Sequence, residues 1–477
     1  MFTRFIPKLK YLFFFLFIFS LPLQKRHIFS DTLLAGEFNE WTAISLYLSD
    51  IFLILTFLFW LAEFLVKHRM KPHPFQSHIT YPILPITYYL LPITIISAFS
   101  LINAENLNLA IFRLAKLLEL IFLFFFIIKN LKIQRSRHYA YAIFLFTMII
   151  QSLIALVQYG QQKSLGLKIL GENNLSPQII GVAEIVVAGE KIMRPYGTFP
   201  HPNVLAGFLI TAIMFCFYFW VLEKTREHDY LKIILLCLIS IFTITLIFTF
   251  SRSAWLGLVI ALIIFIIIGN GEKSFAPTNT GNKNFCSLPD NQKNYRKKIK
   301  TLLPALSVLT LTAIIVSIIF WPQIASRGAV TDSPSGDFAL SNRVFLNQIA
   351  FNFISEQPWF GIGIGNFTTR LRAFAPQLPS WRIQPSHNIY LLWAAEIGIP
   401  GLLLFLFFIW RAISFGLKQI CKNTEIAFLL SLLFAYLAIG LLDHYFYDLQ
   451  QGMLIFWLVL GLIWTILATS SEPPLTE

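Results

Sequence analysis

The stretch PNVLAGFLITAIMFCFYFWVL, residues 202–222, decides the fold class. It contains no charged residue, and it is apolar on every side of a helix. About 20 apolar residues in a row cross the hydrocarbon core of a bilayer as one helix. A helix that is apolar all round is either buried in a large protein or surrounded by lipid. This stretch therefore predicts a transmembrane helix.

The composition of the whole chain agrees with this prediction. Of 477 residues, 56% are hydrophobic and only 13% are charged. A soluble protein of this size needs more charge to cover its surface. Because only helices and closed barrels satisfy their backbone in lipid, the repeated long apolar runs predict an all-α, polytopic bundle of about 12 transmembrane helices. The expected spans are 8–23, 42–66, 80–101, 110–128, 139–159, 202–222, 232–250, 254–269, 302–322, 389–410, 424–441 and 452–469.

The distribution of Lys and Arg predicts the topology. When the N-terminus is placed in the cytoplasm, most of the 37 Lys and Arg residues fall in cytoplasmic loops. This bias is the usual one for membrane proteins. It predicts a multi-pass protein of the cell inner (plasma) membrane with both termini in the cytoplasm. It also accounts for most of the net charge of +13 without a nucleic acid partner.

One integral membrane domain is expected over residues 1–477. The segment 270–301 is rich in Asn and Lys and predicts a flexible cytoplasmic loop. Residues 323–388 form the largest extracytoplasmic loop, which is expected to be partly helical, with a short amphipathic helix over 343–354.

The first candidate site precedes the apolar run 202–222. It reads RPYGTFPHPN over residues 194–203. Its prolines and glycine fix the backbone where the chain enters the membrane. The planar guanidinium of Arg194 suits a phosphate, and Asn203 suits a helix cap or a substrate contact. The alternative is a rigid turn with an interfacial arginine.

The second candidate is Ser251-Arg252-Ser253, between two apolar runs. The connection is so short that Arg252 is expected at or just inside the membrane surface. An ionised side chain at that depth needs a partner. A diphosphate is one candidate, and a snorkelling arginine at a tight turn is the alternative.

The third candidate combines Arg343 with the glycine-rich segment PWFGIGIGNF at 358–367. Its glycines alternate, which is not the spacing of a dinucleotide loop, and no strand and helix surround them. The segment therefore favours a close backbone packing turn, with backbone amides that contribute to anion binding.

The fourth candidate is QPSHNIY, residues 384–390, at the outer mouth of a predicted span. His387 suits general base catalysis near neutral pH, with Asn388 and Tyr390 as candidate substrate contacts. Glu396 lies too far along the helix to be a direct partner of His387 by sequence alone. The alternative is an interfacial histidine that caps the helix.

Two further clusters of polar residues are more simply explained by a structural role than by a catalytic one. Residues 443–448, DHYFYD, suit an interfacial aromatic belt, with acceptor binding as the alternative. Arg113, Lys116 and Glu119 share one face of a helix and favour a buried ion network. The 4 cysteines lack CxxC spacing, and HExxH and DxD are absent, so the sequence predicts no metal site and no cofactor.

Five of these segments occur in an order that resembles a known family. They are RPYGTFPHPNVLAGF at 194–208, TFSRSAWLGL at 249–258, NRVFLNQIAF at 342–351, PWFGIGIGNF at 358–367 and SHNIYLLWAAEIGIPGLLLF at 386–405. Over residues 140–465 the chain resembles the O-antigen ligase and polymerase superfamily of bacterial envelope glycan enzymes.

The resemblance implies a fold like that of C-type glycosyltransferases and a donor glycan on undecaprenyl diphosphate. It implies an inverting, metal-independent transfer to a hydroxyl of a lipid or polymer glycan acceptor. His387 matches the base, and Arg252 and Arg343 match the arginines that hold the diphosphate. Arg194 is a further candidate because a diphosphate leaving group needs preorganised cationic donors.

The sequence leaves three functions open. A ligase and a polymerase use the same donor and differ in their acceptor, which the sequence does not identify. A transporter or flippase of a polyprenyl-linked glycan is the alternative without catalysis, although it is expected to carry charges along a path at the membrane midplane.

Overall fold

The computed structural model describes residues 2–34, 36–69, 83–222, 229–270, 302–328, 334–420 and 423–470. The predicted loop 270–301 falls outside these ranges apart from its first residue. The described chain is mostly helical. The long helices are α1 (Phe2–Ser20), α2 (Leu48–Arg69), α3 (Ile83–Phe99), α4 (Leu107–Asn130), α5 (Gln134–Gln161), α6 (Pro202–Leu222), α7 (Asp229–Phe248), α8 (Arg252–Asn270), α10 (Leu303–Ile319), α12 (Pro334–Glu356), α14 (Ile389–Gln419), α15 (Thr424–Gly440) and α17 (Gln450–Ser470).

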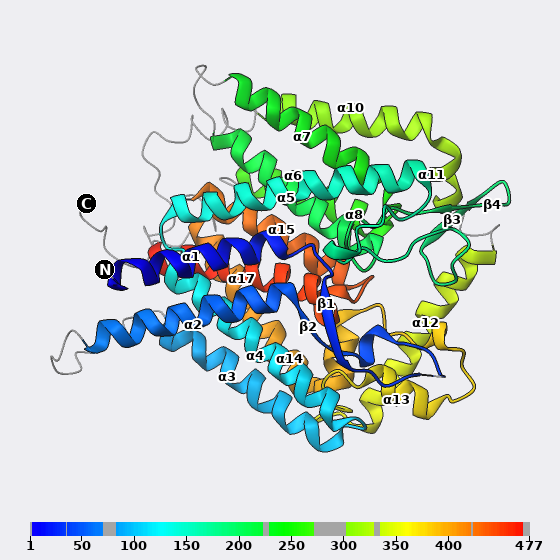
Figure 1. Ribbon diagram of the computed structural model, residues 1–477, viewed down its shortest axis with the longest axis horizontal. Coiled ribbons are helices and arrows are strands. Elements are labelled where there is room, and N and C mark those ends of the chain that lie inside the picture. Colours follow the sequence, from blue (N-terminus) through cyan, green and yellow to red (C-terminus); the bar gives the residue numbers. More distant parts are fainter. Residues whose placement is uncertain are drawn as a thin grey trace, which may run out of the picture.

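Short elements connect these helices. They are the helices α11 (Trp321–Gly328), α13 (Phe367–Phe374) and α16 (Tyr445–Asp448), and the strands β1 (Arg26–Ser30), β2 (Ile44–Tyr47), β3 (Glu184–Val187) and β4 (Glu190–Met193). The strands form two antiparallel hairpins, β1–β2 and β3–β4. The long helices run side by side, and both hairpins, α12 and α13 gather at one end of the bundle, on the right of Figure 1. We call this the loop end.

Each of the twelve predicted apolar runs coincides with a helix, but the predicted number of spans is not confirmed. Only six of the described helices are long and apolar enough to cross a membrane, or seven if a bent pair counts as one span. That pair is α10 with α11, which meet at 93°. The regions Thr87–Asn103, Arg252–Ile268 and Thr424–Gly440 are apolar but shorter.

Two other expectations need correction. The all-α prediction omitted the two hairpins, which are short and lie outside the helical core. The helix expected over 343–354 is longer and extends over the whole of α12. The chain therefore matches the predicted class of helical membrane protein, with more local structure at the loop end than its composition indicated.

The position of α6 explains its uniform apolarity. Almost all of its residues are buried, because α7, α8, α15 and α5 surround it. The peripheral helix α2 instead exposes Ile54, Leu58 and Leu61 along one side. Exposed apolar rows of this kind suit lipid and not water.

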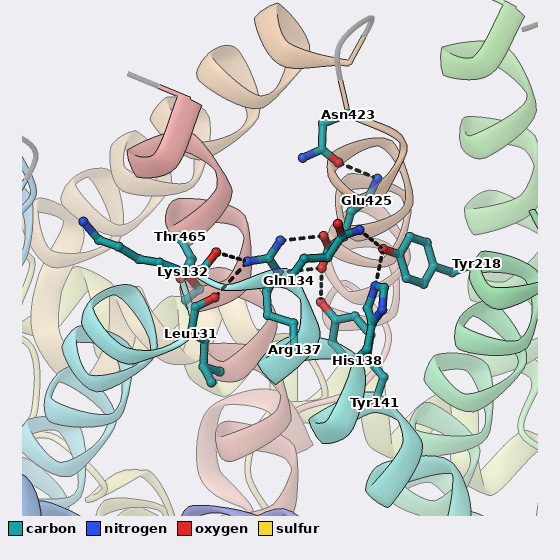
Figure 2. Close-up of polar contacts among 11 residues, drawn as sticks. Leu131, Lys132, Gln134, Arg137, His138, Tyr141, Tyr218, Asn423, Glu425 and Thr465 are labelled. Carbon is teal, nitrogen blue, oxygen red and sulfur yellow. Dashed lines mark hydrogen bonds and ion pairs between the residues drawn. The ribbon is translucent and has the colours of Figure 1, made fainter. Parts of the chain in front are cut away.

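A buried ion pair fixes the opposite end of the bundle. Arg137 on α5 donates from Nε and Nη2 to the two carboxylate oxygens of Glu425 on α15, each at 2.8 Å. Its remaining nitrogen donates to the carbonyls of Leu131 and Lys132 after α4, and Tyr141 donates to Glu425 (Figure 2). The bidentate geometry and the added hydrogen bonds are what a desolvated pair needs in order to be stable. This end therefore joins α4, α5 and α15 rigidly.

We expect the substitution Arg137→Met to lower the free energy of unfolding by about 3–5 kcal/mol, because it leaves the Glu425 carboxylate buried without its cation. Thermal unfolding in detergent measures this change as a large fall in Tm.

Two variants serve as controls for this prediction. Lys191→Ala removes an exposed ion pair with Glu184 and is expected to change Tm little. The double substitution Arg137→Met with Glu425→Leu removes both charges and is expected to recover most of the loss. An unchanged Tm for Arg137→Met alone would contradict the assignment.

Candidate functional site

The buried guanidinium of Arg194 joins three segments at the loop end. Its Nε donates to the carbonyl of Thr249 and its Nη2 to Oδ1 of Asn203, both at 2.6 Å. The amide of Asn203 donates in turn to Oδ2 of Asp443 at 2.6 Å. Arg194 is 5% exposed. The connections before α6, between α7 and α8, and after α15 are therefore held together by one buried chain of hydrogen bonds.

Two glutamines of α5 hold the backbone next to Arg194. Oε1 of Gln158 accepts hydrogen bonds from the amides of Tyr196 and Gly197, and Oε1 of Gln151 accepts from the amide of Thr198. Gly197 has φ 62°, and a Cβ there would lie 2.7 Å from Gln151 Oε1. The glycine of the motif is therefore required by a close approach as well as by its backbone angle.

Four arginines gather around this chain of hydrogen bonds. Arg252 begins α8 and donates from Nη1 to the carbonyl of Arg327, at 3.2 Å. Burial, together with the positive charges of Arg327 and Arg343, lowers the pKa of Arg194 to about 9. Nε of Arg327 is buried and has no hydrogen-bond partner within the described ranges. Desolvated cations that repel one another form a site in which an anion is stabilised.

The loop before α14 is bound to the helix that carries Arg343. Ser386 donates its hydroxyl to Oδ1 of Asn347, one turn beyond Arg343 on α12, at 2.7 Å. The side chain of Asn388 caps α14 by accepting from the amides of Tyr390 and Leu391. His387 lies between these two anchors and is thus positioned relative to Arg343.

His387 is buried beside a second histidine. The rings of His387 and His444 meet edge to face, with 4.9 Å between centroids. Burial, together with the charges of His444 and Arg343, lowers the pKa of His387 to about 3. Nδ1 of His387 is buried with no partner in the described part of the chain. His387 is therefore neutral at physiological pH and able to accept a proton.

The glycine-rich segment packs against a break in α14. Gly361, Gly363 and Gly365 all have positive φ, and a Cβ at Gly361 would lie 2.3 Å from the backbone of Glu396. The amides of Gly365 and Phe367 donate to the carboxylate of Glu396, at 2.6 and 3.1 Å. The expected packing turn is confirmed, and the anion bound by its backbone amides is a carboxylate of the protein itself.

The structure brings together five of the residues proposed from the sequence. Arg194, Asn203, Arg252, Arg343 and His387 all lie at the loop end. The hydroxyl of Tyr390 donates to the carbonyl of Leu437, so both Tyr390 and Asn388 have structural hydrogen bonds. Their contact with a substrate stays a prediction.

Several residues of the site escaped the sequence reasoning. Arg327 is one of many arginines in the long loop, and nothing in its neighbours distinguishes it. Gln151 and Gln158 lie inside an apolar run, where a buried amide needs a partner, so their polarity was a usable signal. Among the described residues, no group of three His, Cys, Asp or Glu side chains is arranged to hold a metal ion.

The apolar helices and the cluster of arginines and histidines at one end define a multi-pass membrane protein. Residues 233–406 match the protein family described as O-antigen ligase. The match includes Arg252, Arg343 and His387. This match supports membership of the O-antigen ligase superfamily and a role in glycan processing at a membrane. No curated protein matches the chain.

The pair of His444 and Asp448 makes stability depend on pH. Burial alone lowers the pKa of His444, but the charges of Asp448 and Asp443 together raise it above 6.5. Nδ1 of His444 lies 2.8 Å from Oδ1 of Asp448. A histidine whose pKa is higher in the folded state than in the unfolded state stabilises the fold. This stabilisation is complete at a pH below the unfolded-state pKa, and it is lost as the pH rises through the folded-state pKa.

We expect Asp448→Asn to flatten the fall of Tm as the pH rises above about 6.5, because His444 then loses the neighbouring carboxylate that raises its pKa. Tm measured as a function of pH tests this expectation. Asp229→Asn, at an exposed carboxylate that begins α7, is the control and is expected to keep the parent profile. A parent profile in Asp448→Asn would contradict the role of the pair.

Proposed function

We propose that this protein transfers a glycan from an undecaprenyl-diphosphate-linked donor to a hydroxyl of an acceptor glycan. We place the reaction at the loop end, on the extracytoplasmic face of the inner membrane, with both termini in the cytoplasm. The observation that carries the proposal is the convergence of Arg194, Arg252, Arg327 and Arg343 beside the neutral His387.

The arginines suit a diphosphate for an electrostatic reason. Burial and mutual repulsion already lower the pKa of Arg194 to about 9. A bound diphosphate relieves that repulsion, and guanidinium groups bind phosphate oxygens in bidentate geometry. Because the leaving group gains negative charge as its bond to the sugar breaks, preorganised cations stabilise the transition state. Arg252 and Arg343 are assigned this role, with Arg194 and Arg327 as supports.

His387 is assigned the role of general base. The acceptor oxygen forms a bond to the anomeric carbon, the bond from that carbon to the diphosphate oxygen breaks, and the hydroxyl proton passes to His387. A base works best when its pKa is near the operating pH. A diphosphate beside Arg343 offsets the positive charge there and therefore raises the pKa of His387 toward that range.

The two neighbouring histidines suit the role of base less well. Nδ1 of His201 accepts a hydrogen bond from the amide of Asn203, at 3.1 Å, which leaves its other nitrogen as a donor. Nδ1 of His444 is already engaged by Oδ1 of Asp448, at 2.8 Å. His387 alone of the three is both neutral and free of a hydrogen bond at Nδ1 within the described residues.

A polymerase and a transporter are the competing functions. A polymerase uses the same donor, so the proposal extends to it with a different acceptor. A transporter is expected to carry free charges along a central path. The charged group on α4 is instead paired, since Lys116 forms ion pairs with Asp50 and Glu119. This pairing favours an enzyme over a transporter.

We expect His387→Ala to lower glycan transfer by about 100- to 10,000-fold, because it removes the base. Arg252→Ala and Arg343→Ala are expected to lower transfer by about 100- to 1,000-fold each, because they remove cations that stabilise the leaving group. The assay is glycan transfer by purified protein in detergent with a lipid-linked oligosaccharide donor.

Arg135→Ala is the matched control, since this exposed arginine lies at the opposite end and is expected to leave transfer unchanged. Full activity of His387→Ala would refute the proposed base. Glycan movement that occurs only in sealed vesicles, with no product in detergent, would favour a transporter.

A further inference from the structure

A cavity lies next to the segment that carries His387, and it is separate from the arginine cluster. It has a volume of about 750 Å³ and is lined by residues of α4, α13, α14, α16 and α17. None of Arg194, Arg252, Arg327 and Arg343 lines it. This volume includes space at the mouth of the cavity that is open to solvent.

Four lining residues carry buried polar atoms with no hydrogen-bond partner within the described ranges. They are Nε1 of Trp41, Nε of Arg113, Oγ1 of Thr368 and Oδ2 of Asp448. A buried polar atom without a partner costs free energy. Native proteins contain few of them, so four around one cavity indicate that a ligand or ordered water completes the site.

Backbone carbonyls hold the guanidinium of Arg113 in place beside the cavity. Its two terminal nitrogens donate to the carbonyls of Asp448 and Trp41, at 2.9 and 3.1 Å. The guanidinium is thus fixed, and only Nε lacks a partner. Sequence spacing suggested that Arg113 joins Lys116 and Glu119 in an ion network. In the described part of the chain, however, the ion pairs of this group join Lys116 to Glu119 and to Asp50, and none includes Arg113. Arg113 therefore belongs to the cavity.

The chemistry of the lining selects a neutral, hydroxyl-rich ligand. Trp41 and Arg113 offer donors, Asp448 offers an acceptor, and Thr368 offers both. The lining holds two basic residues, Arg113 and Lys116, and two carboxylic acids, Glu396 and Asp448, so it favours neither an anion nor a cation. The aromatic rings of the lining suit the apolar face of a sugar ring, and they come from Trp393, Phe405, Phe446, Tyr447, Phe456 and Trp457.

The cavity reaches the proposed base. Pro385 and Ile389, two residues to either side of His387, both line it. Asp448 also lines it and is hydrogen-bonded to His444, whose ring contacts that of His387. The cavity therefore extends to the neighbours of His387 in the chain, and this end of it is where the proposal places the attacking hydroxyl.

We propose that this cavity binds the sugar of the acceptor that carries the attacking hydroxyl, while the separate arginine cluster binds the donor diphosphate. The assignment of this sugar as acceptor rests on the proposed transfer function. The binding of a sugar in the cavity does not, because it follows from the lining alone.

The test uses substitutions that remove unpartnered groups and break no hydrogen bond of the protein. Thr368→Val deletes the hydroxyl and keeps the shape, and Trp41→Phe deletes the indole N–H and keeps a ring. Thr369→Val is the matched control, because Thr369 also has a buried hydroxyl without a described partner but does not line the cavity. Unchanged Tm in all three variants confirms that the fold is intact.

Binding is measured by saturation-transfer NMR with the methyl glycosides of glucose, galactose, mannose and N-acetylglucosamine. The protein is held in phosphatidylcholine nanodiscs, since maltoside detergents would supply sugar rings of their own. We expect at least one glycoside to receive saturation from the parent protein, and its affinity to fall about three- to tenfold in Thr368→Val and in Trp41→Phe. Thr369→Val is expected to match the parent.

Two outcomes overturn the proposal. One is that no glycoside receives saturation from the parent protein, which means that water alone fills the cavity. The other is that Thr368→Val and Trp41→Phe bind as tightly as Thr369→Val. The variant His387→Ala separates this inference from the transfer function, because it is expected to bind the sugar while transferring no glycan.

Discussion

The desolvated guanidinium of Arg194 is the interaction on which the loop end depends. A cation that has left water must be given hydrogen bonds by the protein, or its burial is too costly. Here Thr249 and Asn203 supply them, and Asn203 passes the connection to Asp443. Three connections far apart in sequence are thereby fixed in one place. The carbonyl of Thr249 follows the C-terminus of α7, where a positive charge is also favoured by the helix dipole.

Much of the fold was readable from the sequence because lipid imposes a simple rule. A long run without charge, such as residues 202–222, has few alternatives to a helix, so each apolar run became one. The number of membrane spans could not be predicted in the same way. The length of an apolar run does not show where a helix bends, as α10 and α11 do at 93°. The hairpins were missed because short surface strands depend on their partners more than on their own composition.

The predicted topology indicated which residues of the site lie on the same side of the membrane. Placing loops on one side of the membrane brought Arg194, Arg252, Arg343 and His387 to one compartment. Their neighbours depended on contacts between distant segments, which a single sequence does not record. Glu396 shows the limit, because its carboxylate accepts hydrogen bonds from a loop thirty residues earlier and not from His387. Arg327 and the second side of the site, around Asp448, became visible only in three dimensions.

The helix α14 is interrupted at Gly398, which divides it into two parts. Gly398 has φ 88°, and the amide of Ile399 donates to the carbonyl of Pro358 and not within its own helix. The part of α14 that follows His387 is thus attached to the glycine-rich segment. The part after Gly398 has one side packed in the core and another exposed, with residues such as Leu403 and Phe407. The tilt of this second part in a membrane can therefore vary without a matching movement of His387, since the chain between them does not continue as one regular helix.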